Sequence, residues 1–275
     1  EGLQRIAAAG LTSFALEAAP RTTRAQSMDV LSSQANIAGY KAVMVAADKY
    51  QRFFPMLMTA AGTVKAARVV ILGVGVAGLQ AIATAKRLGA VIEASDVRPS
   101  VKEQVESLGG RFLTVEGAEG VKVEGGYAKE VSAEYLEKQQ QLIRDKIKDA
   151  DLVITTALVM GKKSPILVTE DMVKSMKMGS VIVDMAVESG GNCALSEKNK
   201  TVVKHGVTLV GESNLPSLLP VNASNLYATN ITTLLLHLVN KDGLQLDLEE
   251  EITKGVVITH AGELIHPFTK SILTK

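Results

Sequence analysis

The stretch that decides the fold is RVVILGVGVAGLQAIATA, residues 68–85. Its first part is apolar and rich in β-branched residues, which predicts a buried strand, and its last part predicts a helix. Glycines stand between the two, at positions 73, 75 and 78. A strand, a Gly-x-Gly-x-x-Gly turn and a helix in this order are typical of a site that binds a dinucleotide.

Each residue type in this turn has a physical reason. Gly73 permits the tight turn, Gly75 lets the backbone approach a pyrophosphate, and Gly78 lets the helix pack against the sheet. The helix begins near Val76, and its N-terminus faces the anion. We therefore expect Gly73, Gly75, Val76 and Gly78 to contact the cofactor.

Asp96 ends the next predicted strand, 23 residues after Gly73. A carboxylate at this place accepts hydrogen bonds from the ribose hydroxyls of an adenosine, and it repels a 2′-phosphate. Arg98 lies close by, where it either accommodates such a phosphate or pairs with Asp96. The carboxylate favours NAD over NADP as the cofactor.

Strands and helices alternate along the middle of the chain. The strand runs are apolar nearly throughout, as expected of strands that are covered on both faces. We predict strands at 68–73, 90–96, 111–115, 150–157, 180–187 and 207–212, and helices at 77–88, 100–108, 132–148 and 169–177. This order predicts an α/β fold with a doubly wound parallel sheet, a Rossmann domain.

Two further helices bracket that sheet, at 34–51 and at 222–239, the second with Asn222 as its cap. Strand-like runs lie outside them, TSFALE (12–17) and GVVITHAGELI (255–265). We predict that residues 35–229 form the NAD-binding domain with its connecting helices. This domain is inserted in a second α/β domain, of which residues 1–34 and 230–275 are a fragment.

The chain starts with Glu1 and has no basic leader. We expect it to be an N-terminally truncated piece of a longer chain, with other strands of the outer domain upstream.

Composition excludes several classes of protein. Thirty basic and 29 acidic residues give a formal charge of +1, and no block of like charge predicts a nucleic-acid surface. No apolar run reaches the roughly 18 residues of a membrane span. Cys193 is the only cysteine, so there is no internal disulfide, and it reads as a small hydrophobic residue rather than a nucleophile. No metal site is predicted.

The nicotinamide is expected across the carboxyl ends of the strands, at TTALVMGKKSP (155–165) and MAVESGGNC (185–193). Leu158 is placed to press on the dinucleotide. Gly190 and Gly191 either allow its close approach or form an ordinary turn. None of the four histidines, His205, His237, His260 and His266, falls near this place, so no general base is evident.

The segment RTTRAQSMD (21–29) is rich in polar groups for a connector. Gln26 can satisfy both the donor and the acceptor of a carboxamide, while Arg21 and Asp29 pair with each other or reach the cofactor. The alternative is a helix start capped by Ser32 or Ser33, with solvated charges. A glycine-rich segment, 116–130, is expected to be a mobile flap.

Together these motifs resemble one family. PRTTRAQSMDVLSSQANIAGYKAV, TAAGTVKAARVVILGVGVAGLQAIATAKRLGA, GGYAKE, TTALVMGKKSP and GSVIVDMAVESGGNC are similar to the NAD(H)-binding component, domain I, of proton-translocating NAD(P) transhydrogenase. The resemblance runs from about Leu16 to the end of the chain. The glycine fingerprint and GSVIVDMAVESGG are similar also to alanine dehydrogenase, a relative with the same fold.

The resemblance implies that a hydride passes between NAD(H) on this chain and NADP(H) on a partner domain III, coupled to proton movement by a membrane domain II. It also implies a homodimer and a soluble piece that is held by its other domains at the cytoplasmic or matrix side of a coupling membrane. The residues that it matches to the nicotinamide site and its mobile loop are Arg21, Gln26, Asp29, Ser32, Gly126 and Tyr127. Those that it matches to the adenosine ribose are Asp96 and Arg98.

Two alternatives stay open. An alanine-dehydrogenase-like enzyme would oxidise a small amino acid with NAD. A non-catalytic NAD-binding module would bind the cofactor and transfer nothing.

Overall fold

The structure is a computed structural model of the 275-residue chain. It describes residues 1–115, 122–124, 127–130, 132–159 and 162–273, and for 122–124, 127–130 and 272–273 the description covers the backbone alone. The chain divides into two compact units. Unit 1 consists of Glu1–Gln34 and Pro220–Lys275, and unit 2 of Ala35–Leu219.

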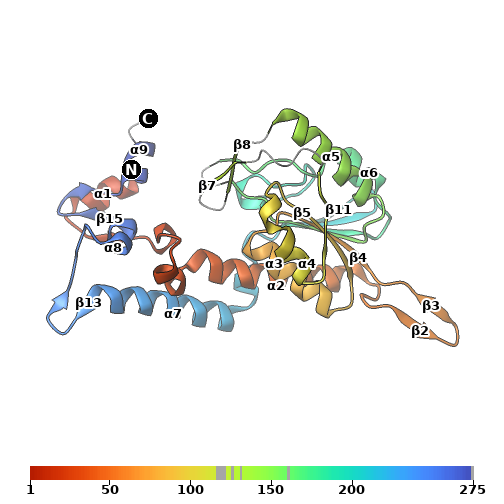
Figure 1. The fold of residues 1–275 in the computed structure, drawn as a ribbon, viewed down its shortest axis with the longest axis horizontal. Coiled ribbons are helices and arrows are strands. Elements are labelled where there is room, and N and C mark those ends of the chain that lie inside the picture. The colour runs from red at the N-terminus through yellow and green to blue at the C-terminus, as the bar shows by residue number, and fades with distance from the viewer. Residues whose placement is uncertain (116–121, 125–126, 131, 160–161, 274–275) are drawn as a thin grey trace. The chain divides into compact units, whose positions relative to one another are not determined.

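The centre of unit 2 is a seven-stranded sheet (Figure 1). All neighbouring strands in it are parallel except the border pair β11 and β12. In spatial order the strands are β11 (Thr201–Lys204), β12 (Val207–Val210), β10 (Val181–Asp184), β9 (Leu152–Thr155), β4 (Arg68–Leu72), β5 (Val91–Ser95) and β6 (Arg111–Phe112). The predicted doubly wound parallel sheet is confirmed.

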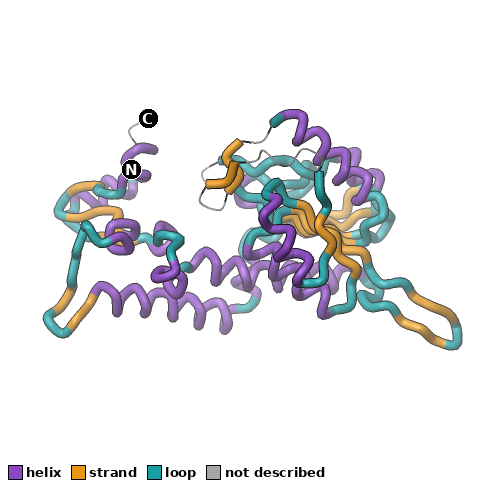
Figure 2. The backbone as a smooth tube through the Cα atoms, in the orientation of Figure 1, coloured by secondary structure: helices purple, strands orange, loops and turns teal. Residues whose placement is uncertain are grey.

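Helices cover both faces of this sheet (Figure 2). In β4, Val69 and Ile71 belong to one buried core, whereas Val70 and Leu72 belong to the other. The first core includes residues of α2, α3 and α4, and the second includes residues of α5 and α6. The helices are α2 (Val30–Tyr50), α3 (Val76–Arg87), α4 (Lys102–Ser107), α5 (Ala133–Ile147) and α6 (Glu170–Ser175). Burial on both faces explains why the strand runs are apolar without alternation.

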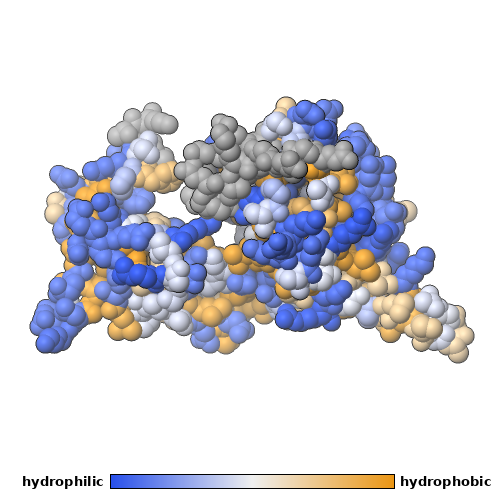
Figure 3. Space-filling model, viewed as in Figure 1, coloured by the Kyte–Doolittle hydropathy of each residue, from blue (hydrophilic) through white to orange (hydrophobic). Residues whose placement is uncertain are grey.

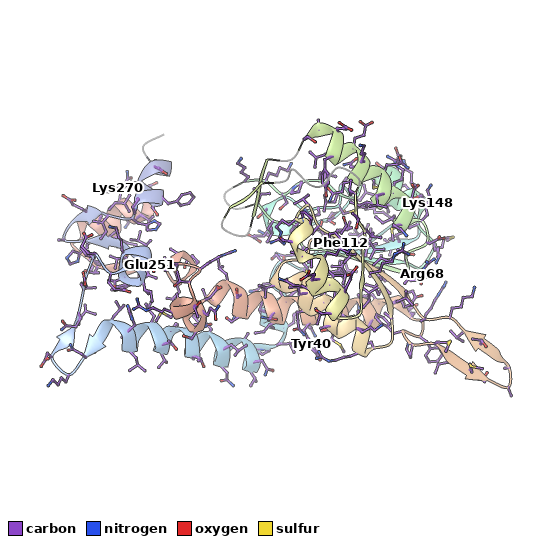
Figure 4. The ribbon with its side chains drawn as sticks, viewed as in Figure 1. Tyr40, Arg68, Phe112, Lys148, Glu251 and Lys270 are labelled. Carbon is purple, nitrogen blue, oxygen red and sulfur yellow. The ribbon has the colours of Figure 1, made fainter. Side chains whose placement is uncertain are left out.

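Short elements connect these pieces. A hairpin of β2 (Leu57–Thr59) and β3 (Gly62–Val64) extends from unit 2, and it is coloured mostly white to pale orange, that is, of intermediate to moderately hydrophobic character (Figure 3). The other short elements of unit 2 are η3 (Pro99–Val101), the hairpin of β7 (Lys122–Glu124) and β8 (Tyr127–Glu130), η5 (Val187–Ser189) and η6 (Leu215–Leu218). Arg68 marks the start of β4 at the amino edge of the sheet, and Phe112 marks the end of β6 (Figure 4).

Unit 1 is built from both ends of the chain. Its three-stranded sheet has the order β1–β15–β16, and its core joins Ala25 and Met28 to Leu234, Leu238 and Ile252. Its elements are α1 (Gly2–Ala8), β1 (Ser13–Phe14), η1 (Leu16–Ala18), η2 (Thr23–Met28), α7 (Pro220–Leu238), β13 (Val239–Asn240), β14 (Gly243–Leu244), α8 (Glu251–Val256), β15 (Val257–His260), β16 (Glu263–Leu264) and α9 (Pro267–Leu273).

Some predicted elements differ from those observed. Helix α7 begins at Pro220, so Asn222 lies inside the helix and is not its cap. Proline has no N–H to satisfy and a fixed φ, which suits the first position of a helix. The run at 12–17 gives only two strand residues before it turns into η1, and the run at 255–265 begins within α8.

Within the described residues, no helix combines the length and the apolar character that crossing a membrane requires.

Glu250 ties three segments of unit 1 together. Its carboxylate accepts hydrogen bonds from the Thr253 backbone N–H at the start of α8 (2.8 Å) and pairs with the His237 ring of α7 (3.0 Å). Its other oxygen lies 3.2 Å from the Arg24 guanidinium of η2. Burial raises the pKa of this carboxyl, but the bonds from Thr253 and His237 outweigh burial and lower the pKa to about 2.

Unit 1 is therefore expected to lose stability in acid. Because the folded pKa lies below the ordinary value of 4.5, the stabilisation is present above pH 4.5 and is lost as the pH falls through 2. The loss amounts to roughly 3 kcal/mol at most. Unfolding free energies measured between pH 7 and pH 2 check this, and Glu250→Gln should flatten the dependence.

The matched control is Glu249→Gln, since the Glu249 side chain is 89% exposed. Equal acid sensitivity in the wild type and in Glu250→Gln would show that Glu250 is not the group responsible.

Candidate functional site

The glycine turn joins the end of β4 to the start of α3. Gly73 has a φ of +96°, and a β-carbon there would lie 2.6 Å from Thr156 Oγ1. A β-carbon on Gly78 would overlap the Gly73 carbonyl oxygen, whereas one on Gly75 would meet open space. Gly73 and Gly78 are thus required by the fold itself. Gly75 is not, which leaves the approach of a ligand as the reason for a glycine there.

The first turn of α3 opens at this place. Gly75 precedes the helix as its N-cap residue, and Val76 is the first helical residue. The N–H groups of a first helical turn have no partner within the helix, so together with the helix dipole they form a site for an anion. A pyrophosphate fits this arrangement.

Asp96 holds the turn to the end of β5. Its carboxylate is 8% exposed and accepts a hydrogen bond from Val74 N–H at 2.7 Å. Arg98 folds back on the same carboxylate, donating from its backbone N–H (2.8 Å), Nε (2.9 Å) and Nη2 (2.9 Å). Arg98 Nη2 also donates to the Val74 carbonyl at 3.1 Å. Of the two predicted roles of Arg98, pairing with Asp96 is the one this structure shows.

Buried polar side chains surround this pair. Gln139 of α5 and Ser95 of β5 are 4% and 2% exposed, with 3.5 Å between Gln139 Nε2 and Ser95 Oγ. Burial, and then the negative charge of Asp96, raise the pKa of the Tyr135 phenol. Sequence reasoning did not single out these three residues. The signal was present, since Tyr135 and Gln139 are spaced i, i+4 on one face of the predicted helix.

The loop after β9 lies beside the glycine turn. Strand β4 pairs with β5 on one side and with β9 on the other, so the strand order reverses at the carboxyl ends of β4 and β9. In open α/β sheets this is where ligands bind. Thr156 Oγ1 donates to the Gly73 carbonyl at 2.9 Å, and Leu158 is 49% exposed.

The loop after β10 is organised by a buried carboxylate. Asp184 is 0% exposed and accepts hydrogen bonds from Ala186, Asn192 and Cys193 N–H groups and from Thr155 Oγ1. These bonds were not predicted from the sequence, because the Asn192 and Cys193 N–H groups reach Asp184 only when the loop after β10 folds back, and Thr155 comes from the neighbouring strand β9.

Two glycines turn the chain in that loop. Gly190 and Gly191 have φ values of +101° and +81°, and a β-carbon on Gly191 would lie 2.9 Å from Asp184 Oδ2. Their positive φ values turn the chain at this point, and the close approach of the dinucleotide to them stays a prediction.

The segment 21–29 lies in unit 1 and forms η2. The Asp29 carboxylate accepts hydrogen bonds from Ser32 N–H (2.9 Å) and Ser32 Oγ (2.6 Å). Because α2 begins at Val30, its cap is Asp29, and the prediction of Ser32 or Ser33 as the cap is wrong. Gln26 is exposed, and among the described residues its amide forms no hydrogen bond.

The predicted site residues that the structure describes with their side chains fall into two sets, one in each unit. Within unit 2 the structure gathers one set at the carboxyl edge of the sheet: Gly73, Gly75, Val76, Gly78, Asp96, Arg98 and Leu158. Within unit 1 it gathers Arg21, Gln26, Asp29 and Ser32 on one segment. Gly126 and most of the predicted flap at 116–130 lie outside the described residues. Tyr127 begins β8, which is described as backbone.

The remaining candidates are accounted for within the two units. Cys193 is 2% exposed, and burial raises the pKa of its thiol, so it reads as a core residue. His205 precedes β12 at the amino edge of the sheet and pairs with Glu170 at 3.1 Å. Among the described residues, no group of three or more His, Cys, Asp or Glu side chains could hold a metal ion.

Comparison with known proteins identifies relatives along nearly the whole chain. The family described as "Alanine dehydrogenase/PNT, C-terminal domain" matches residues 42–267. An NAD(P) transhydrogenase alpha-subunit protein of Rhodospirillum rubrum is 54% identical over 261 residues, which are 94% of this chain and 68% of that protein.

Two solved structures are also similar. The transhydrogenase from Sinorhizobium meliloti is 50% identical with a TM-score of 0.86, over 96% of this chain and 71% of that one. An L-alanine dehydrogenase is 26% identical with a TM-score of 0.74, over 98% of this chain and 71% of that one.

Proposed function

Because the chain belongs to the alanine dehydrogenase/PNT family, among the NAD(P) transhydrogenase alpha subunits, we propose that it binds NAD(H) and exchanges a hydride with NADP(H) on a partner domain. The observation that carries the proposal is the 54% identity to a transhydrogenase alpha subunit over 94% of the chain. An alignment of that extent includes residues of both units. The partner is domain III, and a membrane domain II couples the transfer to proton movement.

The dinucleotide is proposed to lie along the carboxyl edge of the sheet in unit 2. Its pyrophosphate sits over the turn from Gly73 to Gly78, at the N-terminus of α3. The adenosine ribose meets Asp96, which Arg98 accompanies. The nicotinamide extends over the loops after β9 and β10, beside Leu158.

The chemistry of the proposed reaction suits this edge. Hydride exchange between two nicotinamides moves no accompanying proton, so it needs no general acid or base. It needs the two C4 atoms within about 3–3.5 Å and the exclusion of water. Oxidation of an amine or alcohol would need a base. The one histidine of unit 2, His205, lies at the opposite edge of the sheet, which supports hydride exchange.

Arg21, Gln26, Asp29 and Ser32 are proposed to position the nicotinamide. The Asp29–Ser32 hydrogen bonds give the segment its shape and start α2, while the exposed amide of Gln26 can bind the carboxamide as donor and acceptor. Tyr127, with Gly126, is proposed to belong to a loop that closes over the bound nucleotide.

The assembly is also a proposal. We expect a homodimer of this chain, joined through domains II and III to the cytoplasmic or matrix side of a coupling membrane. The alpha-subunit names of the relatives support a complex of several subunits.

The test is to mix the chain with an NADP(H)-binding domain III and to follow the reduction of an NAD analogue by NADH in the presence of NADP(H). Turnover that requires domain III supports the proposal. NAD reduction with L-alanine alone would identify an alanine dehydrogenase, to whose structure the chain is also similar. NADH binding without any transfer would leave a binding module.

Gly75→Ala distinguishes an effect on ligand binding from an effect on folding. Because a β-carbon at Gly75 meets open space and its φ of −83° suits alanine, the free energy of unfolding should change by less than about 0.5 kcal/mol. The methyl group occupies space that the pyrophosphate needs, so NADH affinity should fall about tenfold or more. Denaturant unfolding and NADH fluorescence titration measure the two effects.

Gly78→Ala is the contrasting variant, since its β-carbon overlaps the Gly73 carbonyl and should destabilise unit 2 strongly. Unchanged NADH affinity in Gly75→Ala would place the pyrophosphate elsewhere.

Asp96→Ala should relax the preference for NAD. Removing the carboxylate takes away the negative charge that would repel a 2′-phosphate and that Arg98 now binds, so the affinity ratio should move toward NADP by about tenfold. Asp96→Asn keeps an oxygen for Val74 N–H and controls for damage to the turn. The gain in NADP affinity should vanish in the double variant Asp96→Ala/Arg98→Ala. Titrations that show unchanged discrimination contradict the assignment.

Gln26→Leu should slow hydride transfer by about tenfold or more while NADH affinity changes little, because the adenosine half supplies most of the binding. Stopped-flow transfer with domain III and equilibrium titration give the two numbers. Thr23→Ala, an exposed change in the same segment, serves as the control. Asp29→Ala is less informative because it also removes the cap of α2. Equal losses in the hydride-transfer rate and in NADH affinity would argue against a positioning role for Gln26.

A further inference from the structure

Asn192 lies in the loop after β10 and is 0% exposed. Its side-chain amide uses its hydrogen-bonding groups on another loop. Oδ1 accepts from Ala157 N–H at 3.0 Å, while Nδ2 donates to the Ala157 carbonyl at 2.9 Å and to the Pro165 carbonyl at 2.8 Å. One side chain therefore holds both polar backbone groups of Ala157.

The backbone of Asn192 is anchored as firmly as its side chain. Its N–H donates to the Asp184 carboxylate, 2.9 Å from Oδ2 and 3.1 Å from Oδ1. Its carbonyl accepts from Leu167 N–H at 2.8 Å and from Val168 N–H at 3.0 Å. The residue joins the end of β10 to both ends of the loop that follows β9.

This junction continues to the glycine turn. Thr156, next to Ala157, donates its hydroxyl to the Gly73 carbonyl at 2.9 Å. A β-carbon on Gly73 would lie 2.9 Å from Ala157 N, so the two backbones approach closely. Hydrogen bonds thus join Asp184 to Asn192 and Asn192 to Ala157, and the preceding residue, Thr156, bonds to the Gly73 carbonyl.

We propose that Asn192 is a positioning residue, which fixes the Thr156–Leu158 backbone as a preformed wall for the nicotinamide half of the bound dinucleotide. The inference rests on the proposed function. A wall that is ordered before binding spares the ligand the cost of ordering it, and it sets where the ring lies. Because the Ala157 N–H already donates to Asn192, it is not a donor for the nicotinamide carboxamide.

The amide cannot be replaced by a carboxylate. An aspartate at 192 would lose the two donated bonds to the Ala157 and Pro165 carbonyls and would bring a second negative charge beside Asp184. Asn192→Ser, which is small and neutral, is the better variant.

The experiment compares two ligands on the full chain. ADP-ribose contains the adenosine half and the pyrophosphate, whereas NADH contains the nicotinamide as well. In Asn192→Ser, NADH affinity should fall about tenfold, and ADP-ribose affinity should stay within about twofold. Hydride transfer to domain III should slow by at least as much as NADH binding weakens.

The matched control is Ser180→Ala. Ser180 is 2% exposed and directly precedes β10, and its hydroxyl donates to the carbonyl of Ala150, which lies before β9. Ser180→Ala removes a buried hydrogen bond at the edge of the sheet opposite the proposed ligand site. The affinities for NADH and for ADP-ribose should therefore remain those of the wild type. Equal loss for both ligands in Asn192→Ser, or loss for neither, overturns the inference.

A second measurement uses the wild type alone and does not depend on how a variant folds. Hydrogen exchange of the Ala157 amide should be slow without any nucleotide, since the wall is preformed. Rapid exchange that slows only when NADH is added overturns the inference. A wild type that binds neither ADP-ribose nor NADH would instead refute the proposed function.

Discussion

The close packing of α3 on the end of β4 is the constraint on which the carboxyl edge of the sheet depends. The Gly73 carbonyl lies so close to Gly78 that no side chain fits at position 78. The same carbonyl accepts the Thr156 hydroxyl, which brings the loop after β9 against the turn. One peptide unit thereby fixes the helix N-terminus and the adjacent loop together.

Two buried carboxylates also stabilise the carboxyl edge of the sheet. Asp96 and Asp184 are both buried carboxylates at the ends of strands, and both are compensated by hydrogen-bond donors. Asp96 is matched mainly by a side-chain guanidinium, whereas Asp184 is matched mainly by backbone N–H groups. A charged acceptor with fixed donors forms strong hydrogen bonds and holds one conformation. The second arrangement therefore holds the loop after β10 in one conformation.

The sequence predicts the parallel strands and the glycine turn because both follow from local patterns, apolar runs and glycine spacing. It does not predict β11 or the β2–β3 hairpin. Thr201–Lys204 is short and mostly exposed, and Met58 and Thr59 lack the alternation of a half-buried strand. The predicted cap of α2, Ser32 or Ser33, lies about one helical turn after the observed cap, Asp29, because both serine and aspartate can cap a helix and both occur there. The role of Asn192 was not predicted because the Ala157 and Pro165 groups that it binds lie about 30 residues away in the loop after β9. The role of Asp184 was not predicted because the Asn192 and Cys193 N–H groups reach it only when the loop after β10 folds back.

The two borders of the large sheet differ in how they end. Strand β6 has only two residues, so it offers few free backbone groups to another chain. Strand β11 runs antiparallel to its neighbour, and Lys200 and Lys204 lie at its two ends, both paired with Glu197. Short strands and lysines at an edge oppose the addition of further strands. Neither border strand therefore favours the addition of a strand from another chain, β6 because it is short and β11 because lysines lie at its ends.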